Sequence, residues 1–423
     1  MRILTLCPYF YNSNYPEHTK NKTGFGIMVM GIVNSLCEQG NEVFVLTHTL
    51  CPQRVDGALV ILKHKLIGVL LHAPIFGLCI KISSICRLAG SLGAKLKLLY
   101  YFLDKGCVKN AILRIKPDIV HIHGVGLGSK NYVEVCQELD VPFVITAHGL
   151  IENDPSASQA ERKFEMEFFR ESERTGIPVT VVSTGIKRRL TQDYYGLNNA
   201  DNIHVVTNGT DTHMMETTDD IRSKHGIPDG CKICLAVGSV CENKNQLQIV
   251  RAFSVLPSRL RENTRVLIIG KTSDNYQIKQ EISRLGLDDY VKSCGFVKQE
   301  KLRNYYATAD LNILASKDEG FGLSIIEGFV YGAPCVTFSD LDAVSDVYDE
   351  NAMELCDDRA DESFSKAIAA ALEKQWDKDE IKQHSKKFSL QAMGEKYMNV
   401  YTQTINGFIN CRTFGGSNER KDR

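Results

Sequence analysis

Two glutamates that flank a glycine loop are the residues of this chain with the clearest chemical potential. Glu319 and Glu327 stand on either side of Gly320, Phe321 and Gly322, and a short apolar run precedes the second glutamate. A glycine loop that opens a helix offers free backbone N–H groups and the positive end of the helix dipole, which together bind phosphate. A carboxylate one turn into the same helix can accept hydrogen bonds from both hydroxyls of a ribose. The segment therefore predicts a nucleotide-binding site.

The same segment permits a purely structural interpretation. Ser324 and Glu327 have the spacing of a capping box, in which serine is the N-cap of a helix and glutamate its third residue. Glu327 would then close the start of the helix, and the glycines would only turn the chain. The segment alone leaves both interpretations open.

Composition indicates an ordinary globular protein of 423 residues, long enough for two sizeable domains. A formal net charge of −1 argues against a nucleic-acid-binding protein. The 14 cysteines have no framework spacing, which favours a reducing compartment and hence the cytoplasm. Cys231 and Cys234 form a C-x-x-C pair without a second pair, so we expect packing there rather than zinc.

Neither a signal peptide nor a transmembrane helix is expected. Met1–Phe10 contains one arginine and a very short apolar run that Pro8 interrupts. The longest charge-free apolar stretch, 66–80, contains Pro74 and is shorter than the ~20 residues that a span needs.

One block of the chain is basic and apolar. Residues 57–103 contain no Asp or Glu among many Leu, Ile and Val residues, a composition that favours contact with an anionic membrane surface. The alternative is two or three ordinary helices with their cations in solvent. The basic residues of the block are Lys63, Lys65, Lys81, Arg87, Lys95 and Lys97.

Both halves of the chain alternate strand and helix patterns, which predicts two α/β domains with parallel sheets. Ligands of such sheets bind beyond the carboxyl ends of the strands. We expect a first domain over 1–212 and a second over 213–388. A carboxy-terminal helix at about 389–409 should pack against the first domain, and residues 411–423 should form a flexible tail. The strand-like runs are ILTLCPYF, EVFVLTH, KPDIVHIHG, VPFVITAHG and VTVVSTG, then CLAVGS, TRVLIIG, VKSCGFV, DLNILAS and PCVTF.

A series of motifs in fixed order resembles the retaining glycosyltransferases of family 4. The resemblance runs from Met1 to about Gly407 and implies the GT-B fold, two Rossmann-like domains whose parallel sheets face a central cleft. The motifs are a glycine loop after the first strand, then VVTNGTD, LAVGSVCENKNQLQIVRAF, VLIIG, GFVKQEKLRNYYATADLNILAS and DEGFGLSIIEGFVYGAPCV.

This resemblance implies roles in the second domain, which would bind the donor. Glu327 matches the glutamate that grips the ribose of a donor nucleotide, and Glu319 matches the one near the donor sugar. Lys244 matches a lysine that neutralises the diphosphate, although it could instead be a solvated lysine ahead of a helix. The loop whose amides touch sugar and diphosphate matches Gly320, Phe321, Gly322 and Leu323. The other residues expected to bind the donor are Gly24, Gly26, Asn208, Gly238 and Ser239, and those expected to be catalytic are Glu319, His148 and Lys244.

The first domain would bind the acceptor. Gly24 and Gly26 match a glycine loop that lets backbone approach phosphate or acceptor, although a G-x-G is usually just a turn. His148 matches a histidine that faces the donor sugar, although a histidine at a strand end can also be a buried hydrogen-bonding residue. His121 and His123 share one face of a strand, but no third ligand is evident, and we expect no metal and no cofactor.

Two departures from the family pattern stand out. Ser239 occupies the place of an arginine that neutralises the diphosphate, and Lys271 or a nearby arginine would have to compensate. Residues 339–344 replace a glycine loop that touches the donor sugar. Within them Asp340-Leu341-Asp342 looks like the D-x-D metal motif of an unrelated fold, a triplet common by chance.

The resemblance implies transfer of a sugar from a UDP- or GDP-sugar to an acceptor hydroxyl, with retention. From the basic block we further expect a lipid-linked or polysaccharide acceptor in bacterial cell-envelope synthesis, at the inner face of the cytoplasmic membrane. Two alternatives stay open: a nucleotide-sugar epimerase on the same fold, and a non-catalytic nucleotide-binding subunit.

Overall fold

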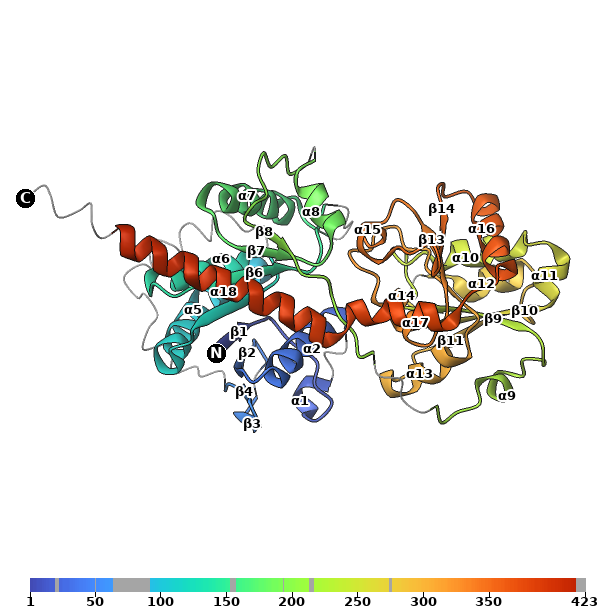
Figure 1. The fold of residues 1–423 in the computed structure, drawn as a ribbon, viewed down its shortest axis with the longest axis horizontal. Helices are drawn as coiled ribbons and strands as arrows, with labels where there is room; N and C mark the ends of the chain where they lie inside the picture. The colour runs from blue at the N-terminus through green and yellow to red at the C-terminus, as the bar shows by residue number, and fades with distance from the viewer. Residues whose placement is uncertain are drawn as a thin grey trace, which may run out of the picture. The chain divides into compact units, whose positions relative to one another are not determined.

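The computed structural model describes residues 1–19, 23–49, 51–63, 92–152, 157–192, 194–212, 217–273 and 276–415. Contacts divide the chain into two compact units, each an α/β structure (Figure 1). The first unit consists of Met1–Val182, Ile186–Val206 and Leu390–Arg423, and the second of Ser183–Gly185 and Thr207–Ser389. The roles predicted for the two domains stay proposals.

The first unit is built on an eight-stranded sheet in the order β3-β4-β2-β1-β5-β6-β7-β8. Its strands are parallel except for β3, which pairs antiparallel with β4. The central strands are short, rich in Val and Ile and almost wholly buried, as a sheet covered on both faces requires. The strands are β1 (Arg2–Leu6), β2 (Glu42–Leu46), β3 (Arg54–Asp56), β4 (Leu59–Ile61), β5 (Ile119–His123), β6 (Phe143–Ala147), β7 (Val179–Val181) and β8 (Ile203–Val205).

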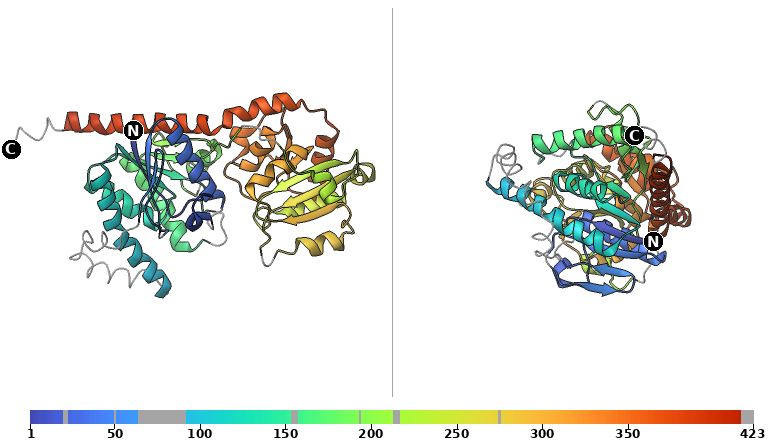
Figure 2. Two further views of the ribbon diagram at one scale, coloured as in Figure 1. Left: turned by 90° about the horizontal axis from the view of Figure 1, so that it is seen from below. Right: turned by 90° about the vertical axis from the view of Figure 1, so that its left-hand side faces the viewer.

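Helix α18 closes the first unit although it comes last in the chain. It packs against α2 and contacts β6, and Figure 2 shows it running along the same side of the unit as α2. The contact is close because Gly394 has no side chain: a Cβ there would lie 2.2 Å from Ser35 Oγ. The helices here are α1 (Pro16–Thr19), α2 (Gly24–Glu38), α5 (Leu92–Ile115), α6 (Leu127–Glu138), α7 (Gln159–Thr175), α8 (Thr184–Leu190, whose first two residues belong to the second unit) and α18 (Leu390–Gly415).

The second unit has a six-stranded, fully parallel sheet in the order β11-β10-β9-β12-β13-β14. Register places the ends of β9 and β10 side by side, since Val237 pairs with Ile269. The strands are β9 (Lys232–Val237), β10 (Thr264–Ile269), β11 (Val291–Gly295), β12 (Leu311–Ile313), β13 (Cys335–Phe338) and β14 (Met353–Cys356). The parallel sheets predicted for both halves of the chain are confirmed.

Helices connect these strands, and several begin at side-chain caps, such as Asp377 at the start of α17. They are α9 (Ile221–His225), α10 (Gln246–Ser254), α11 (Ser258–Glu262), α12 (Ile278–Arg284), α13 (Gln299–Thr308), α14 (Leu323–Val330), α15 (Val344–Val347), α16 (Asp361–Glu373), α17 (Lys378–Ser385) and the 3₁₀ turn η1 (Lys386–Phe388).

Three local expectations change. Part of the basic block, Leu59–Ile61, is strand β4 with Leu59 and Ile61 buried, so it belongs to the sheet; residues 64–91 lie outside the described residues. Helix α18 continues to Gly415, five residues into the predicted tail, of which 416–423 are not described. Gly24 and Gly26 lie in the first turn of α2 and not in a loop, because Thr23 Oγ1 caps the helix by accepting from Gly26 N.

Candidate functional site

The candidate site of the second unit forms where two loops follow neighbouring strands. Strand β12 pairs with β9, so the loop after β12 and the loop after β9 leave the sheet at the same edge. Asn243 joins them: its side-chain amide donates to Asp318 O, and its side-chain oxygen accepts from Asp318 N, both at 3.1 Å. Lys317 N also donates to Asn243 O at 2.7 Å. The loops therefore form one surface from segments 75 residues apart.

Lys244 and Glu319 form an ion pair on this surface. The Glu319 carboxylate also accepts from Ser316 Oγ and from Gly322 N, each at 3.3 Å. The side chain of Glu319 is 15% exposed and that of Lys244 is 26% exposed. Lys244 is thus paired with an acid and mostly buried, rather than fully solvated.

Helix α14 begins at Gly322, whose φ of 74° is a left-handed conformation that favours glycine. Gly322 is the N-cap and makes no side-chain cap, whereas Ser324 is the second residue of the helix. The capping-box interpretation is therefore wrong. The first-turn amides of Leu323 and Ser324 have no partner among the hydrogen bonds of the described residues, and a helix start with free amides suits an anion.

Glu327 lies one turn into α14 and binds a residue that the sequence did not single out. Tyr306, on α13, donates its phenol hydrogen to Glu327 Oε2 at 2.6 Å. The ring of Tyr306 is 2% exposed, and burial together with the neighbouring carboxylate raises the pKa of its phenol. Tyr306 remains a hydrogen-bond donor at any physiological pH and fixes one oxygen of Glu327.

Between the two glutamates, Phe321 is a core residue. Its side chain is 2% exposed and meets Phe388 edge-on at 5.8 Å between ring centroids. Only the backbone of Phe321 is therefore left for a ligand, as the resemblance implied, while Gly320 beside it is half-buried.

Gly238 and Ser239 follow β9 at the same edge of the sheet. The aliphatic stem of Lys244 passes 3.8 Å from the position that a Cβ of Gly238 would occupy. Gln246 holds the turn by donating to Ser239 O at 3.0 Å, and Ser239 itself is exposed. Lys271 follows β10 and is exposed too, and its carbonyl accepts from Val240 N at 2.9 Å. The structure therefore places a lysine next to the serine that replaces the expected arginine.

The loop at 339–344 is held by a salt bridge. Arg359 binds Asp340 through two nitrogens, at 2.9 and 2.7 Å, and lies over the Phe338 ring. Ala343 N donates to Glu319 O at 3.2 Å, which ties the loop to the candidate site. No group of three possible metal ligands occurs among the described residues, and Asp340 is committed to arginine.

Asn208 is a further predicted site residue of the second unit. It is 7% exposed, and its amide oxygen is buried without a hydrogen-bond partner among the described residues. An orphaned buried acceptor is unfavourable unless a ligand donates to it.

Gly24, Gly26 and His148 belong to the first unit. His148 comes just after β6, is half-buried, and meets Phe25 edge-on at 5.0 Å. Burial lowers the pKa of its imidazole to about 4, so the ring is neutral at pH 7. Its Nε2 lies 3.0 Å from Nδ1 of His123, and its Nδ1 is buried with no hydrogen-bond partner among the described residues. His148 therefore has one buried, unpaired nitrogen at the carboxyl end of the sheet.

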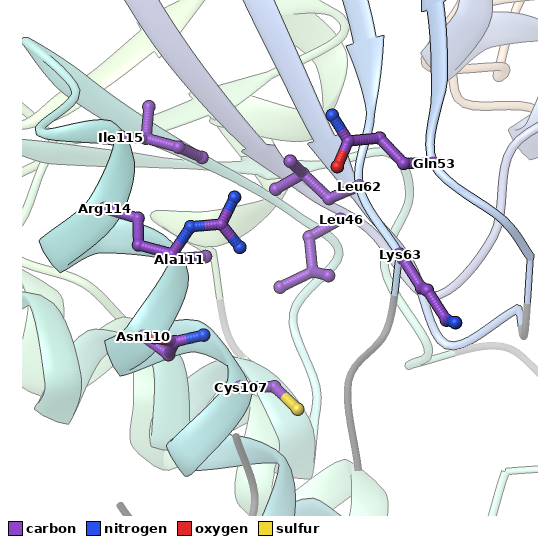
Figure 3. A pocket seen from close by; sticks show the side chains of 9 residues that line it. All are labelled: Leu46, Gln53, Leu62, Lys63, Cys107, Asn110, Ala111, Arg114 and Ile115. Carbon is purple, nitrogen blue, oxygen red and sulfur yellow. The ribbon is translucent and has the colours of Figure 1, made fainter. Parts of the chain in front are cut away.

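A separate small pocket of the first unit contains none of these residues. It lies between α5 and β2, where Arg114 and Cys107 of α5 approach Leu46 and Leu62 (Figure 3). Its volume of about 30 Å³ holds a few water molecules at most. It is too small for a nucleotide.

Comparison with known proteins identifies the family. Residues 23–214 match the family described as Glycosyltransferase Family 4, and residues 217–388 match Glycosyl transferases group 1. The chain belongs to glycosyltransferase family 4. Together the two matches run from residue 23 to residue 388 of this family-4 chain, with a gap at 215–216.

Solved structures show that the family-4 chain has the GT-B fold. Sucrose-phosphate synthase of Thermosynechococcus elongatus superposes with a TM-score of 0.72 at 16% identity, over 96% of this chain and 99% of that one. Anabaena HepE in complex with UDP superposes with a TM-score of 0.66 at 16% identity, over 95% and 100%. At such identities the likeness establishes the fold alone.

The curated relatives align with a smaller share of the chain than the solved structures do. Mannosylfructose-phosphate synthase of Agrobacterium fabrum is 28% identical over 51% of this chain and 52% of its own length. Alpha-monoglucosyldiacylglycerol synthase of Acholeplasma laidlawii is 23% identical over 56% and 61%. The family-4 chain spans about half the length of the first curated relatives that it matches. Within the described residues, no helix has the length and apolar character to span a membrane.

Proposed function

We propose that this protein is a glycosyltransferase that moves a sugar from a nucleoside-diphosphate donor to an acceptor hydroxyl. One observation carries the proposal: Lys244, the open start of α14 and Glu327 lie together beyond the carboxyl ends of β9 and β12. A cation and free amides can bind a diphosphate, and a fixed carboxylate can accept from the hydroxyls of the ribose joined to it.

The donor would bind to the second unit. The diphosphate meets Lys244 and the amides of Leu323 and Ser324, and the ribose hydroxyls donate to the Glu327 carboxylate that Tyr306 holds. The UDP complex of HepE, a protein of the same fold, supports a uridine nucleotide, and a guanosine nucleotide is the second candidate.

Glu319 would compete with the donor for Lys244. Its carboxylate takes the Lys244 ammonium and the Gly322 amide, two groups that a diphosphate would use. Donor binding therefore exchanges one anion for another at Lys244, and the released Glu319 becomes available to hydroxyls of the donor sugar.

The reaction needs charge stabilisation more than proton transfer by the protein. When the bond between sugar and phosphate breaks, the leaving diphosphate gains negative charge, and Lys244 stabilises it. Retention follows if the acceptor attacks from the side of the leaving group, where a diphosphate oxygen takes its proton. His148 would contact the donor sugar, and the reaction would require no metal.

The first unit would bind the acceptor, which we propose is a lipid-linked or polysaccharide hydroxyl of the cell envelope. The acid-free composition of 57–103 supports contact with the inner face of the cytoplasmic membrane. A relative named alpha-monoglucosyldiacylglycerol synthase points to a lipid acceptor, whereas mannosylfructose-phosphate synthase points to a sugar phosphate.

The test combines donors and acceptors. Purified protein is incubated with UDP-glucose, GDP-mannose or ADP-glucose, with either diacylglycerol in anionic vesicles or soluble sugar phosphates, and the nucleoside diphosphate released is measured. Release that depends on vesicles supports the whole proposal, and release with a soluble acceptor alone overturns the lipid acceptor. An isomeric nucleotide sugar would identify an epimerase, and binding without turnover a non-catalytic subunit.

A further inference from the structure

A row of polar side chains crosses one face of the sheet in the first unit, where apolar residues would be expected. His121 and His123 are two residues apart on β5, and Thr146 of β6 and Thr180 of β7 continue the row. All four are at most 3% exposed. Because buried polar groups are unfavourable unless they are hydrogen-bonded, the row requires an explanation.

Helix α18 covers the row with two tyrosines. Tyr397 and Tyr401 stand one turn apart, and both are fully buried. The phenol oxygen of Tyr401 lies 2.6 Å from His121 Nδ1, and that of Tyr397 lies 3.4 Å from Thr146 Oγ1. The shorter contact thus joins the last helix of the chain to a central strand.

Both ring nitrogens of His121 are hydrogen-bonded to hydroxyl groups. Its Nε2 lies 2.6 Å from Thr146 Oγ1, and its Nδ1 lies 2.6 Å from the Tyr401 oxygen. Because one nitrogen of a neutral imidazole donates and the other accepts, these two hydroxyls together set the tautomer and the orientation of His121. Tyr401 is one of the two.

From His121 the contacts lead to His148. The rings of His121 and His123 lie 3.9 Å apart between centroids, and the ring of His123 is nearly parallel to that of His148, at 22°. Nδ1 of His123 and Nε2 of His148 are 3.0 Å apart. The contacts thus run in sequence from Tyr401 to His121, then to His123, and then to His148.

We propose that Tyr401 is a positioning residue that sets the orientation of His148 through His121 and His123. This inference rests on the proposed function, in which His148 contacts the donor sugar. Tyr401 touches neither donor nor acceptor, and it acts by fixing the tautomer and the place of His121.

The first test needs no ligand. The ¹⁵N imidazole signals of His121, His123 and His148 are compared in the wild type, in Tyr401→Phe and in Tyr195→Phe. Tyr195 is the matched control, because it is fully buried in the same unit and donates a 2.6 Å hydrogen bond to Glu165 outside the row. The proposal expects His148 signals to change in Tyr401→Phe alone. A change confined to His121 overturns it.

The second test is a double-mutant cycle on turnover of UDP-glucose, GDP-mannose or ADP-glucose, whichever the protein uses. Losing one hydrogen bond in the row should lower kcat about tenfold in Tyr401→Phe, with the donor KM unchanged. In a His148→Ala background the same substitution should have no further effect. Equal losses in both backgrounds would show a merely structural role and overturn the inference. If His148→Ala alone leaves turnover unchanged, the role proposed for His148 fails instead.

Discussion

The ammonium group of Lys244 and the carboxylate of Glu319 form an ion pair between loops that follow different strands, 75 residues apart in the chain. Glu319 also accepts a hydrogen bond from the Gly322 amide. The same carboxylate therefore both neutralises Lys244 and contacts the N-cap of α14. The Glu319 carboxylate thus holds two groups that a diphosphate would also use. Binding of a diphosphate must compete with it.

Replacing Lys244 by alanine should lower kcat/KM by about 100-fold, since it removes the charge that faces the leaving diphosphate. Lys317 is a suitable control, because it pairs with Glu242 across the same two loops and is 49% exposed. Steady-state kinetics of both alanine variants decides the matter. Similar losses in the two variants would show that the pairs only hold the loops together.

Removing the phenol oxygen of Tyr306 should weaken donor binding by about three- to tenfold, because Glu327 loses the hydrogen bond that orients it. Tyr305 precedes it on α13 and is equally buried, but its hydroxyl has other partners: it accepts from Lys224 Nζ at 3.1 Å and lies 3.1 Å from His225 Nε2. Titration calorimetry with the nucleoside diphosphate should therefore separate Tyr306→Phe from Tyr305→Phe. Indistinguishable affinities would contradict the role of Tyr306.

Lys271 should act as the second cation at the diphosphate, in place of the arginine that Ser239 replaces. The Lys271→Ala variant should bind the nucleoside diphosphate several-fold more weakly and with a smaller dependence on salt. Lys279, an exposed lysine of α12, provides the control. The account of Ser239 is wrong if Lys271→Ala and Lys279→Ala bind alike at low and high salt.

Acid should destabilise the protein through the histidine row. Burial lowers the pKa of His121 to about 3 and of His148 to about 4, and that of His123 lies well below its ordinary value. These three histidines take up protons below pH 6.5 in the unfolded chain but stay neutral in the folded chain. Stability present above 6.5 is therefore lost as pH falls toward 4, by at most about 1.4 kcal/mol per pH unit for each histidine.

Urea unfolding between pH 7.5 and 5 measures this slope. The pKa values of His18, His204 and His225 shift in the same direction through burial, so the total slope alone does not identify the row. The informative comparison is His121→Asn, whose slope should be smaller by one proton. An unchanged slope would contradict a neutral, buried His121.

The fold was largely predictable because its strands are short runs of β-branched residues that end in glycine or polar residues. The β3–β4 hairpin escaped prediction, since Leu59–Ile61 sits within a basic block whose composition suggested a membrane surface. Gly24 and Gly26 suggested a loop, but the Thr23 cap starts the helix there. In each case a local contact outweighed the average character of the segment.

The sequence predicted the site residues that lie within motifs, but not the contacts between distant segments. Lys244, Glu319 and Gly322 come together as a set, although no spacing in the sequence shows the ion pair. Tyr306 was missed because two tyrosines are adjacent on α13, and only the rotation of the helix decides which one meets Glu327. Tyr401 lies 280 residues from His121, so no local pattern connects them.

The central claim is that the start of α14 and Lys244 hold the diphosphate of a nucleotide. A crystal structure with UDP, or with GDP or ADP if either binds more tightly, tests it most directly. We expect phosphate oxygens within hydrogen-bond distance of the Leu323 and Ser324 amides, Lys244 turned from Glu319 to phosphate, and ribose hydroxyls on Glu327. A nucleotide bound elsewhere, with the ion pair between Lys244 and Glu319 intact, would contradict the account.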